Sequence, residues 1–298
     1  GLAALDTWQA TRTVTFVALK PGLLLGAGRA LCGEVELVDI GINLGMGNVD
    51  INEVERSDVS QWVPQRPFDS HKWKAALYAV AGSSGMMGAA NLCSASAMRA
   101  GAGIVHVASP GIVSDRSTST EIVRRALPAL GWSHEVLDDL SRFKAIVIGP
   151  GLGRDEGTVS EARRIIAGAH IPMVIDGDGL FAVAWGGEGA RDIVRSRAAG
   201  TVLTPHDGEY TTLLGYAPSH DRITSARRLA SDTNCVCLLK GTTTVVAEPS
   251  GEVLMVANGD QRLATAGTGD VLAGIIGALL AQGVEPFHAA ASGAWIHG

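Results

Sequence analysis

The sequence predicts an α/β fold in which a mostly parallel sheet is covered by helices on both faces. Short, wholly apolar runs recur after residue 75, and helical patterns separate several of them. Such runs are typical of parallel strands that are buried on both sides. The chain has 298 residues, 46% of them hydrophobic, which is enough for a large core. The expected strands are 77–81, 104–108, 145–148, 173–175, 201–204, 236–239, 244–247 and 253–256.

Helices are expected between these strands. Small residues over 89–100 follow a glycine-rich turn at 82–88, and amphipathic patterns cover 156–167 and 221–231. An apolar run continues from 271 to 282. The strands at 244–247 and 253–256 are close together in the sequence, so we expect a hairpin around 248–252.

The N-terminal part has a different character. Residues 13–17 and 35–40 are expected to be strands, joined by a loop that contains Lys20-Pro21-Gly22. Residues 46–63 are polar, and we expect an irregular linker there. Two strands in so short a segment cannot easily enclose a core. We therefore expect residues 1–50 to be the end of a partial domain with its linker, and 64–298 to be the main domain.

Composition excludes some classes of function. A net charge of −6 without a basic block argues against nonspecific nucleic-acid binding. The longest apolar run, 271–281, contains glycines and is too short to span a bilayer. The cysteines lack the paired spacing of a zinc site, and Cys235 and Cys237 are expected on one face of a strand. Reduced, buried thiols predict a cytoplasmic protein.

Residues 265–274, Thr-Ala-Gly-Thr-Gly-Asp-Val-Leu-Ala-Gly, predict a phosphate site at the start of the last apolar helix. Backbone N–H groups at a helix start are unpaired, and the helix dipole adds positive charge there. Glycines let this backbone approach an anion closely. Asp270 would sit beside a transferred phosphate and is our candidate general base. The alternative is a plain Asp cap before a buried helix.

Four further loops follow expected strands. Residues 149–153, Gly-Pro-Gly-Leu-Gly, would let a flat ligand or phosphate lie on the backbone, or would form a tight turn. Residues 204–209 carry His206 and Glu209. His206 would donate to or accept from a ligand, and Glu209 would orient a water on Mg²⁺ or form part of a helix cap; the alternative for His206 is a structural role. Residues 240–244 offer a lysine and three hydroxyls to phosphate or ribose oxygens; the alternative is a hairpin turn with a solvated lysine.

The fourth loop is the acidic stretch after the strand at 173–175. Asp176 and Asp178 would hold Mg²⁺ through water, or Asp178 would cap the next helix. Neither is expected to ligate a metal directly. Together with the turn at 82–88, these loops follow apolar strands, and a parallel sheet brings such ends to one edge. We therefore expect them to share one cleft.

At this point the chain resembles the ADP-dependent NAD(P)H-hydrate dehydratases, a ribokinase-like family. The resemblance implies a ribokinase-like three-layer sandwich. It covers residues 66–298 and rests on a series of short motifs rather than on one glycine pattern. The motifs are HKWKAALYAVAGSSGMMGAA at 71–90, RAGAGIVHVASP at 99–110, IGPGLG at 148–153, VIDGDGL at 174–180, TPHDGE at 204–209, KGTTT at 240–244 and TAGTGDVLAG at 265–274.

Residues 13–42 also look like the C-terminal end of an NAD(P)H-hydrate epimerase domain, which is often fused ahead of the dehydratase. Most of that domain, including the part that would carry its catalytic acid, does not occur in this sequence. We therefore assign no epimerase activity. The family usually continues with another helical segment after a motif like AWIHG, so we expect the C-terminus to be clipped.

The resemblance implies repair of hydrated NADH or NADPH, with the S epimer as substrate. ADP (ATP in eukaryotic relatives) would phosphorylate the hydrate hydroxyl with Mg²⁺ on the phosphates, and loss of phosphate would regenerate the reduced nicotinamide. Asp270 would take the hydroxyl proton. Residues expected to contact the nucleotide are Lys240, Gly241, Thr242, Thr243, Thr244, Gly267, Thr268 and Gly269. Residues expected to contact the hydrated dinucleotide are Ala89, Gly153, His206 and Asp270.

Some positions depart from the family pattern. Ala266 stands where glycine is commoner, Asp207 where proline is frequent, and Trp73 where glycine is commoner. The runner-up function is a small-molecule kinase of the same fold, such as a hydroxyethylthiazole or sugar kinase, which would use the same aspartate. A nucleotide-binding protein without turnover is a third reading. The family also implies a homo-oligomer.

Overall fold

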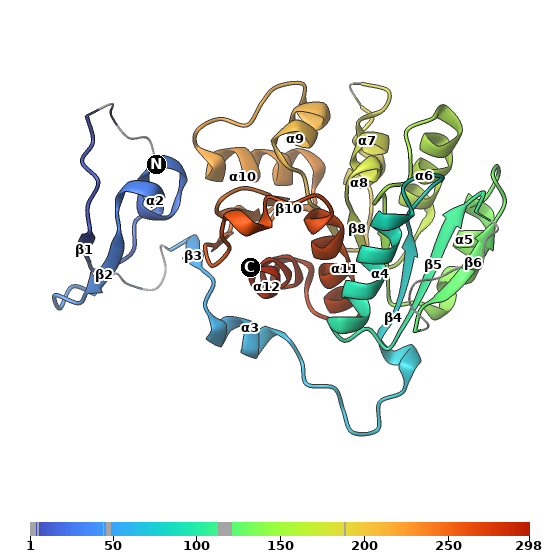
Figure 1. The fold of residues 1–298 in the computed structure, drawn as a ribbon, viewed down its shortest axis with the longest axis horizontal. Coiled ribbons are helices and arrows are strands. Elements are labelled where there is room, and N and C mark those ends of the chain that lie inside the picture. The colour runs from blue at the N-terminus through green and yellow to red at the C-terminus, as the bar shows by residue number, and fades with distance from the viewer. Residues whose placement is uncertain (1–3, 5, 44, 46–48, 113–120, 188) are drawn as a thin grey trace.

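A ten-stranded sheet forms the body of the protein. The computed structural model describes all residues except 1–3, 5, 44, 46–48, 113–120 and 188. The strand order is β3-β12-β11-β10-β9-β8-β7-β4-β5-β6, and only the pairings of β11 are antiparallel (Figure 1). The bounds are β3 Ile51–Glu53, β4 Ala76–Val80, β5 Ile104–Pro110, β6 Val123–Leu127, β7 Ala145–Ile148, β8 Met173–Ile175, β9 Thr201–Leu203, β10 Val236–Leu239, β11 Thr244–Ala247 and β12 Val253–Val256. The predicted α/β class with a mostly parallel sheet is confirmed.

Helices cover both faces of this sheet, because each face carries its own apolar cluster. One layer holds α5 Ser133–Asp139, α6 Glu156–Gly168, α7 Asp178–Ala184, α8 Asp192–Arg195, α9 Asp207–Leu214 and α10 Arg222–Thr233. The other holds α3 Arg56–Trp62, α4 Met87–Arg99, α11 Thr268–Ala281 and α12 Pro286–His297. Short 3₁₀ turns lie at Lys72–Ala75, Leu140–Arg142 and Gln261–Leu263.

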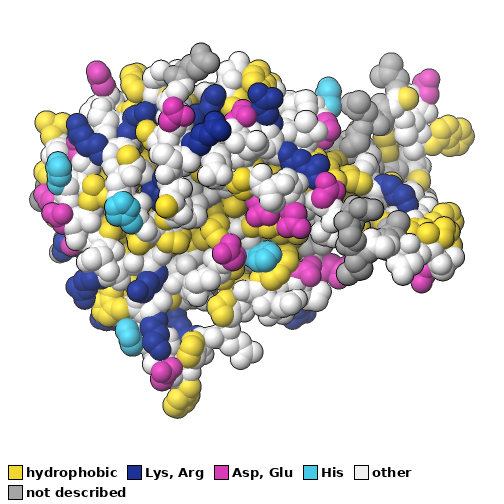
Figure 2. Space-filling model, turned by 180° about the vertical axis from the view of Figure 1, so that it is seen from behind, with side chains coloured by type: hydrophobic (Ala, Val, Ile, Leu, Met, Phe, Trp, Pro, Cys, Tyr) yellow, Lys and Arg dark blue, Asp and Glu magenta, His cyan; other side chains and the backbone are white. Residues whose placement is uncertain are grey.

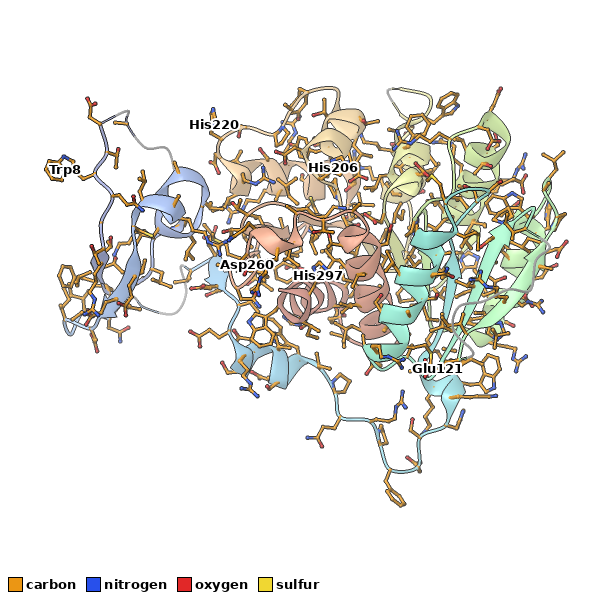
Figure 3. The ribbon with its side chains drawn as sticks, viewed as in Figure 1. Trp8, Glu121, His206, His220, Asp260 and His297 are labelled. Atoms are coloured by element: carbon orange, nitrogen blue, oxygen red, sulfur yellow. The ribbon has the colours of Figure 1, made fainter. Side chains whose placement is uncertain are left out.

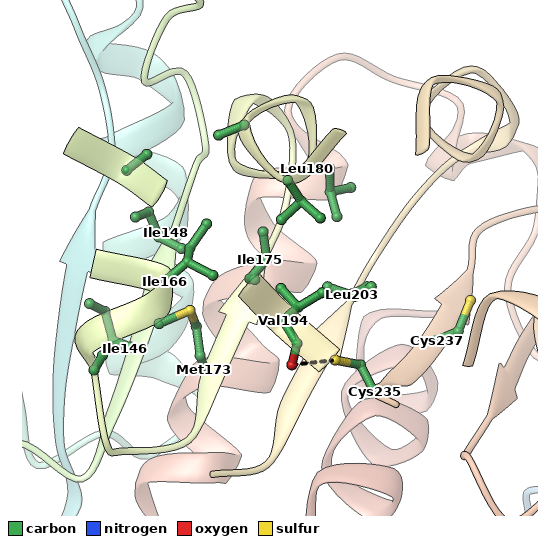
Figure 4. Packing of buried hydrophobic residues seen from close by; sticks show 14 of the residues in the cluster. Ile146, Ile148, Ile166, Met173, Ile175, Leu180, Val194, Leu203, Cys235 and Cys237 are labelled. Atoms are coloured by element: carbon green, nitrogen blue, oxygen red, sulfur yellow. Dashed lines mark hydrogen bonds between the residues drawn. The ribbon is translucent and has the colours of Figure 1, made fainter. Parts of the chain in front are cut away.

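The central strands are buried on both faces. Along β7, Ile146 and Ile148 belong to the first cluster, whereas Val147 belongs to the second. This alternation follows from the two-residue period of a strand. Cys235 and Cys237 are buried, free thiols on the same face, as predicted, and Figure 4 shows Cys235 next to Val194, with the side chains of β7 farther along the sheet.

Helix α11 packs closely against α4. Gly274 makes this possible, because a Cβ at that position would lie 2.0 Å from the carbonyl oxygen of Cys93. Ser96 Oγ of α4 also donates a hydrogen bond to the carbonyl oxygen of Val271 at 2.9 Å. The first half of α11 is thereby fixed beside the middle of α4.

The N-terminal unit lies at one end of the sheet (Figure 1). Its strands β1 Arg12–Phe16 and β2 Glu34–Val38 pair in parallel, and α1 Pro21–Leu24 and α2 Gly26–Leu31 connect them. Leu25 is buried in the core of the large sheet. The strands leave apolar side chains such as Phe16 and Leu37 about half exposed, and yellow side chains gather over this end in Figure 2.

Two expectations about local structure are wrong. Residues 46–63 were expected to be irregular, but β3 pairs with β12 and α3 packs against α12; residues 46–48 lie outside the described part. The sequence of β3, Ile-Asn-Glu, has one apolar residue followed by two polar ones, so it shows none of the apolar pattern by which the other short strands were predicted. We also missed β6, whose sequence Val-Arg-Arg-Ala-Leu carries charge because it is the edge strand. The predicted hairpin of β11 and β12 is confirmed.

Candidate functional site

Five strand-end loops meet at one edge of the sheet, as the sequence predicts. Strands β4, β7, β8, β9 and β10 are neighbours and pair in parallel, so their carboxyl ends point the same way. Contacts also cross between the loops: Gly82 N donates to the carbonyl oxygen of Pro150 at 2.8 Å, and Lys240 N donates to that of Pro205 at 2.9 Å. The edge is therefore one continuous surface.

The start of α11 reaches the same edge. Gly267 precedes the helix with a left-handed φ of 92°, and a Cβ there would lie 2.4 Å from Leu92 of α4, so a side chain is excluded. The first amides of α11 have no partner within the helix. Asp270 lies in this first turn. Its Oδ2 lies 4.0 Å from the place that a Cβ on Gly267 would take, so the carboxylate is beside these amides, and their role as a phosphate site stays a prediction.

Lys240 joins the loop after β10 to the loops after β8 and β9. Its Nζ is 3.0 Å from Asp176 Oδ1 and 3.6 Å from Glu209 Oε2. Asp176 is buried and also accepts a hydrogen bond from Thr204 Oγ1 at 2.7 Å. A Cβ added to Gly269 would lie 3.3 Å from Lys240 Nζ, so the lysine contacts the start of α11. Of the alternative, the hairpin turn is present, since β10 and β11 pair antiparallel, but the solvated lysine is wrong.

The electrostatics of this edge distinguish Asp270 from an ordinary carboxylate. Burial, and after it the carboxylate of Asp176, raise the pKa of Asp270 to about 6 against the opposing charge of Lys240. Burial alone would lower the pKa of Lys240, but Asp176 and Glu209 reverse this, and the net shift is upward. At neutral pH, Asp270 is ionised but basic enough to accept a proton, and Lys240 is charged.

A cavity of about 730 Å³ opens beside Lys240. The predicted residues that line it are His206, Lys240, Gly241, Thr242, Thr244, Thr268 and Gly269. Thr243 is buried behind the wall, where its hydroxyl donates to the carbonyl oxygen of Leu24. Ala89, Gly153, Gly267 and Asp270 do not line this cavity. The cleft expected to hold all the loops therefore covers only the part around β10 and α11.

Comparison with known proteins decides the family at this point. A family model described as NAD(P)H-hydrate dehydratase matches residues 77–298. The chain belongs to this family. It is 38% identical to a bifunctional NAD(P)H-hydrate repair enzyme of Moorella thermoacetica, over 97% of this chain and 57% of that protein. It is 39% identical to the Mycobacterium tuberculosis enzyme of the same name, over 95% of this chain and 56% of that protein. The chain thus spans just over half the length of these curated relatives.

A solved structure supports the same assignment. The ADP/ATP-dependent NAD(P)H-hydrate dehydratase of Bacillus subtilis, co-crystallised with ATP and Mg²⁺, aligns with a TM-score of 0.70 and 28% identity. The alignment covers 85% of this chain and 88% of that one. A ribokinase-like protein of Enterococcus faecalis, 23% identical with a TM-score of 0.71 over 86% of this chain and 88% of that one, shows the fold. The predicted family and the ribokinase-like fold are confirmed.

Two residues expected to contact the hydrated dinucleotide, Ala89 and Gly153, lie outside the cavity, whereas His206 lines it. Gly151 approaches α4 so closely that a Cβ on it would lie 2.8 Å from Ala89 Cβ. Gly153 N donates to Asp178 Oδ2 at 2.8 Å, and Asp178 Oδ1 accepts from Arg154 Nε at 2.6 Å. Asp178 was expected to cap α7 or hold Mg²⁺. It caps nothing, because the cap position is Gly177, and its carboxylate holds the glycine loop instead.

His206 and Glu209 cap the N-terminus of α9, as one of the two alternatives predicted. His206 Nδ1 accepts from the N–H groups of Gly208 and Glu209, and Glu209 Oε2 accepts from His206 N at 2.8 Å. This reciprocal pair fixes the start of α9. The imidazole remains exposed and lines the cavity, so capping and ligand contact are compatible for His206.

Sequence reasoning missed four polar residues of the cavity wall: Arg29, Asp260, Gln261 and His297. Figure 3 shows Asp260 and His297 near the centre of the molecule, close to the C-terminus of the chain. Burial and then Lys240 lower the pKa of His297. A signal did exist for Asp260. Strand β12 runs parallel to β10, since both are antiparallel to β11, and its loop must leave at the same edge.

Two negative findings concern metal binding and membrane insertion. Among the residues that the structure describes, no group of three or more His, Cys, Asp or Glu side chains is arranged to hold a metal ion. In the same part of the chain, no helix combines the length and apolar character needed to cross a bilayer.

Proposed function

We propose that this chain catalyses the ADP-dependent dehydration of NADH or NADPH hydrate, acting on the S epimer. The observation that carries the proposal is Asp270, a carboxylate with a pKa of about 6 held at the amide-lined start of α11. A general base works best when its pKa is near the working pH. Backbone amides at a helix start are suited to a phosphate that gains charge during transfer. One of them, Thr268 N, also donates to the carbonyl oxygen of Thr265 at 3.3 Å.

The reaction follows from these groups. The hydroxyl oxygen of the hydrate bonds to the terminal phosphorus of the nucleotide, and the shortened nucleotide leaves with the electrons of the broken P–O bond. Asp270 takes the hydroxyl proton. The amides of Ala266 to Gly269 stabilise the transferred phosphate. The C–O bond then breaks, phosphate departs with that electron pair, and loss of a ring proton restores the reduced nicotinamide.

The nucleotide would occupy the cavity beside Lys240. Threonine hydroxyls and the lysine face it from the loop after β10, and Leu263, Ala264 and Leu272 supply apolar surface for a base. ATP remains the alternative donor, since the Bacillus subtilis relative was crystallised with ATP and Mg²⁺. Mg²⁺ would neutralise phosphate charge; Asp176 and Glu209, which flank Lys240, are the acidic groups in position to meet it through water.

The runner-up function is a small-molecule kinase with the same base. The family match over 77–298 favours the dehydratase. The residues around Gly153 and Ala89 would then bind hydrated dinucleotide rather than a free sugar or thiazole. A nucleotide-binding protein without turnover is the third possibility, and its only specific support is the methyl group of Ala266, which is exposed at the cradle.

One assay separates these functions. The full chain is incubated with NADH hydrate, Mg²⁺ and either ADP or ATP, and reduced nicotinamide is followed at about 340 nm. The dehydratase restores this absorbance only when nucleotide is present. A small-molecule kinase would consume nucleotide with another alcohol and leave the hydrate unchanged. Asp270→Asn should keep ADP binding and lose turnover by about 10²- to 10⁴-fold.

Three further expectations belong with this function. We propose that residues 13–42 derive from the end of an epimerase domain, since the curated relatives are bifunctional and about twice as long as the matched region. A homo-oligomer and a cytoplasmic location stay predictions. Size measurement of the purified chain and fractionation of cells would test them.

A further inference from the structure

Arg29, on helix α2 of the N-terminal unit, is bonded into the wall of the nucleotide cavity. Its Nη1 donates to the carbonyl oxygen of Thr242 and to Thr243 Oγ1, the latter at 3.0 Å. Its Nη2 donates to the carbonyl oxygens of Ala257 at 2.7 Å and Gly259 at 2.8 Å. One guanidinium therefore joins the loop after β10 to the loop after β12.

The residues on either side of Arg29 also pack against the main domain. Leu25 is buried in the core of the large sheet, and the carbonyl oxygen of Leu24 accepts the hydroxyl of Thr243. Gly26, Arg29 and Ala30 line the cavity directly. Residues 21–31 thus belong structurally to the wall of the cavity, although its other loops all lie beyond residue 200 in the sequence.

We propose that segment 21–31 forms part of the nucleotide site. Arg29 is the positioning residue that holds the 240–244 loop in the conformation that binds a nucleoside diphosphate. This inference rests on the proposed function. Three carbonyl oxygens point at one place, and a cation there satisfies them. A loop that is already ordered loses less entropy when a ligand binds.

The arrangement has a thermodynamic consequence. If the docked segment strengthens nucleotide binding, nucleotide must strengthen the docking of the segment by the same factor. ADP should therefore slow hydrogen exchange of the amides in residues 21–31, a unit that has no role in the chemistry itself. This readout needs no variant.

The decisive experiment compares Arg29→Ala with a matched arginine elsewhere. Arg227 also joins two distant segments through its guanidinium. Its Nε donates to the carbonyl oxygen of Gly251 at 2.7 Å, and its Nη2 donates to Asp50 Oδ2 at 2.6 Å. It does not line the cavity. Arg227→Ala therefore measures how the loss of an arginine that bonds two loops affects ADP binding and Tm when that arginine lies outside the nucleotide site.

For Arg29→Ala we expect KM and Kd for ADP to rise about tenfold, with kcat changed less than about twofold. Arg29→Lys should recover part of the affinity, since one cation remains without the planar fork. Arg227→Ala should keep the ADP affinity of the parent even if its Tm falls. Equal ADP affinity in the parent and in Arg29→Ala would overturn the proposal, as would a loss confined to kcat.

The other outcomes are also decisive. If the parent binds ADP by calorimetry but fails to restore NADH, the proposed function fails, and the ADP affinity of the variants still tests Arg29. If Arg29→Ala does not fold, hydrogen exchange of the parent decides. Protection of residues 21–31 by ADP supports the proposal, and unchanged exchange refutes it.

Discussion

Turnover should fall as the pH drops through about 6, because Asp270 must be ionised to accept the hydroxyl proton. Burial is the main cause of the raised pKa of Asp270, with Asp176 adding to it and Lys240 opposing it. One pH unit below its pKa, a carboxyl is about one-tenth ionised, so the rate there should be about one-tenth of the plateau. An unperturbed aspartate, with a pKa of about 3.9, would keep almost the full rate.

The assay is the initial rate of NADH recovery at saturating hydrate and Mg–ADP, over about pH 4.5 to 8.5, with aliquots transferred to neutral buffer before reading. Asp176→Asn should move the acid limb to lower pH, because it removes the like charge beside Asp270. In Asp270→Asn the residual rate should lose this limb. An acid limb near pH 4 in the parent, or an unaltered limb in Asp270→Asn, would refute the assignment of the base.

The same shift predicts a stability effect of opposite sign. The pKa of Asp270 is higher in the folded protein than its ordinary value of 3.8, so the folded state holds the proton more tightly. The stability contribution of this carboxyl is present below about pH 4 and is lost as the pH rises through about 6. Asp270→Asn should therefore raise Tm at pH 7 more than at pH 4, measured by calorimetry.

Three other substitutions test the packing and charges of the site. Lys240→Met should raise KM for ADP by about tenfold or more and move the acid limb of the rate to higher pH, since this cation lowers the pKa of the base. Asp178→Ala should raise KM for the hydrate and leave KM for ADP unchanged, because its carboxylate holds the glycine loop through Gly153 N. Arg154→Ala, which removes only the ion pair with Asp178, should raise KM for the hydrate less. Equal effects of the two substitutions would contradict the role of Asp178 in holding this loop. Gly274→Ala should cost about 1–3 kcal/mol or more in urea unfolding, because its methyl would meet a carbonyl of α4 at 2.0 Å, whereas Gly88→Ala, which has open space, should cost little.

The sequence predicted the parts of this structure that depend on local pattern. Strands β7, β8, β10, β11 and β12 begin and end where the apolar runs do. The shared edge followed from the parallel pairing of successive strands, because each turn to a helix must leave at the carboxyl end. These features need no knowledge of which residues touch across the fold.

The misses depend on contacts between distant parts of the chain. Nothing near Arg29 in the sequence indicates that its guanidinium meets Ala257 and Gly259. Asp178 has the local pattern of a helix cap, yet its carboxylate turns to Gly153, because the neighbouring strand brings that amide within 2.8 Å. Such pairings are decided by tertiary packing, which a single sequence does not encode locally.

The charges around Asp270 bear on how a nucleotide can bind at all. Asp176, Asp178 and Glu209 raise its pKa, and Lys240 alone among the groups named with it lowers that pKa. Asp178 is paired with Arg154, and the guanidinium of Arg29 is bonded to carbonyl oxygens of the cavity wall, which leaves Asp176, Glu209 and Asp270 around the ammonium of Lys240 at this edge. The amides of α11 supply only partial positive charge, so an unaccompanied diphosphate would meet net repulsion. A nucleotide that arrives with Mg²⁺ is closer to neutral, and we expect ADP affinity to fall sharply when the ion is chelated. Calorimetric titration with ADP in the presence and absence of Mg²⁺ measures this, and equal affinities would mean that Lys240 and the amides overcome the carboxylates unaided.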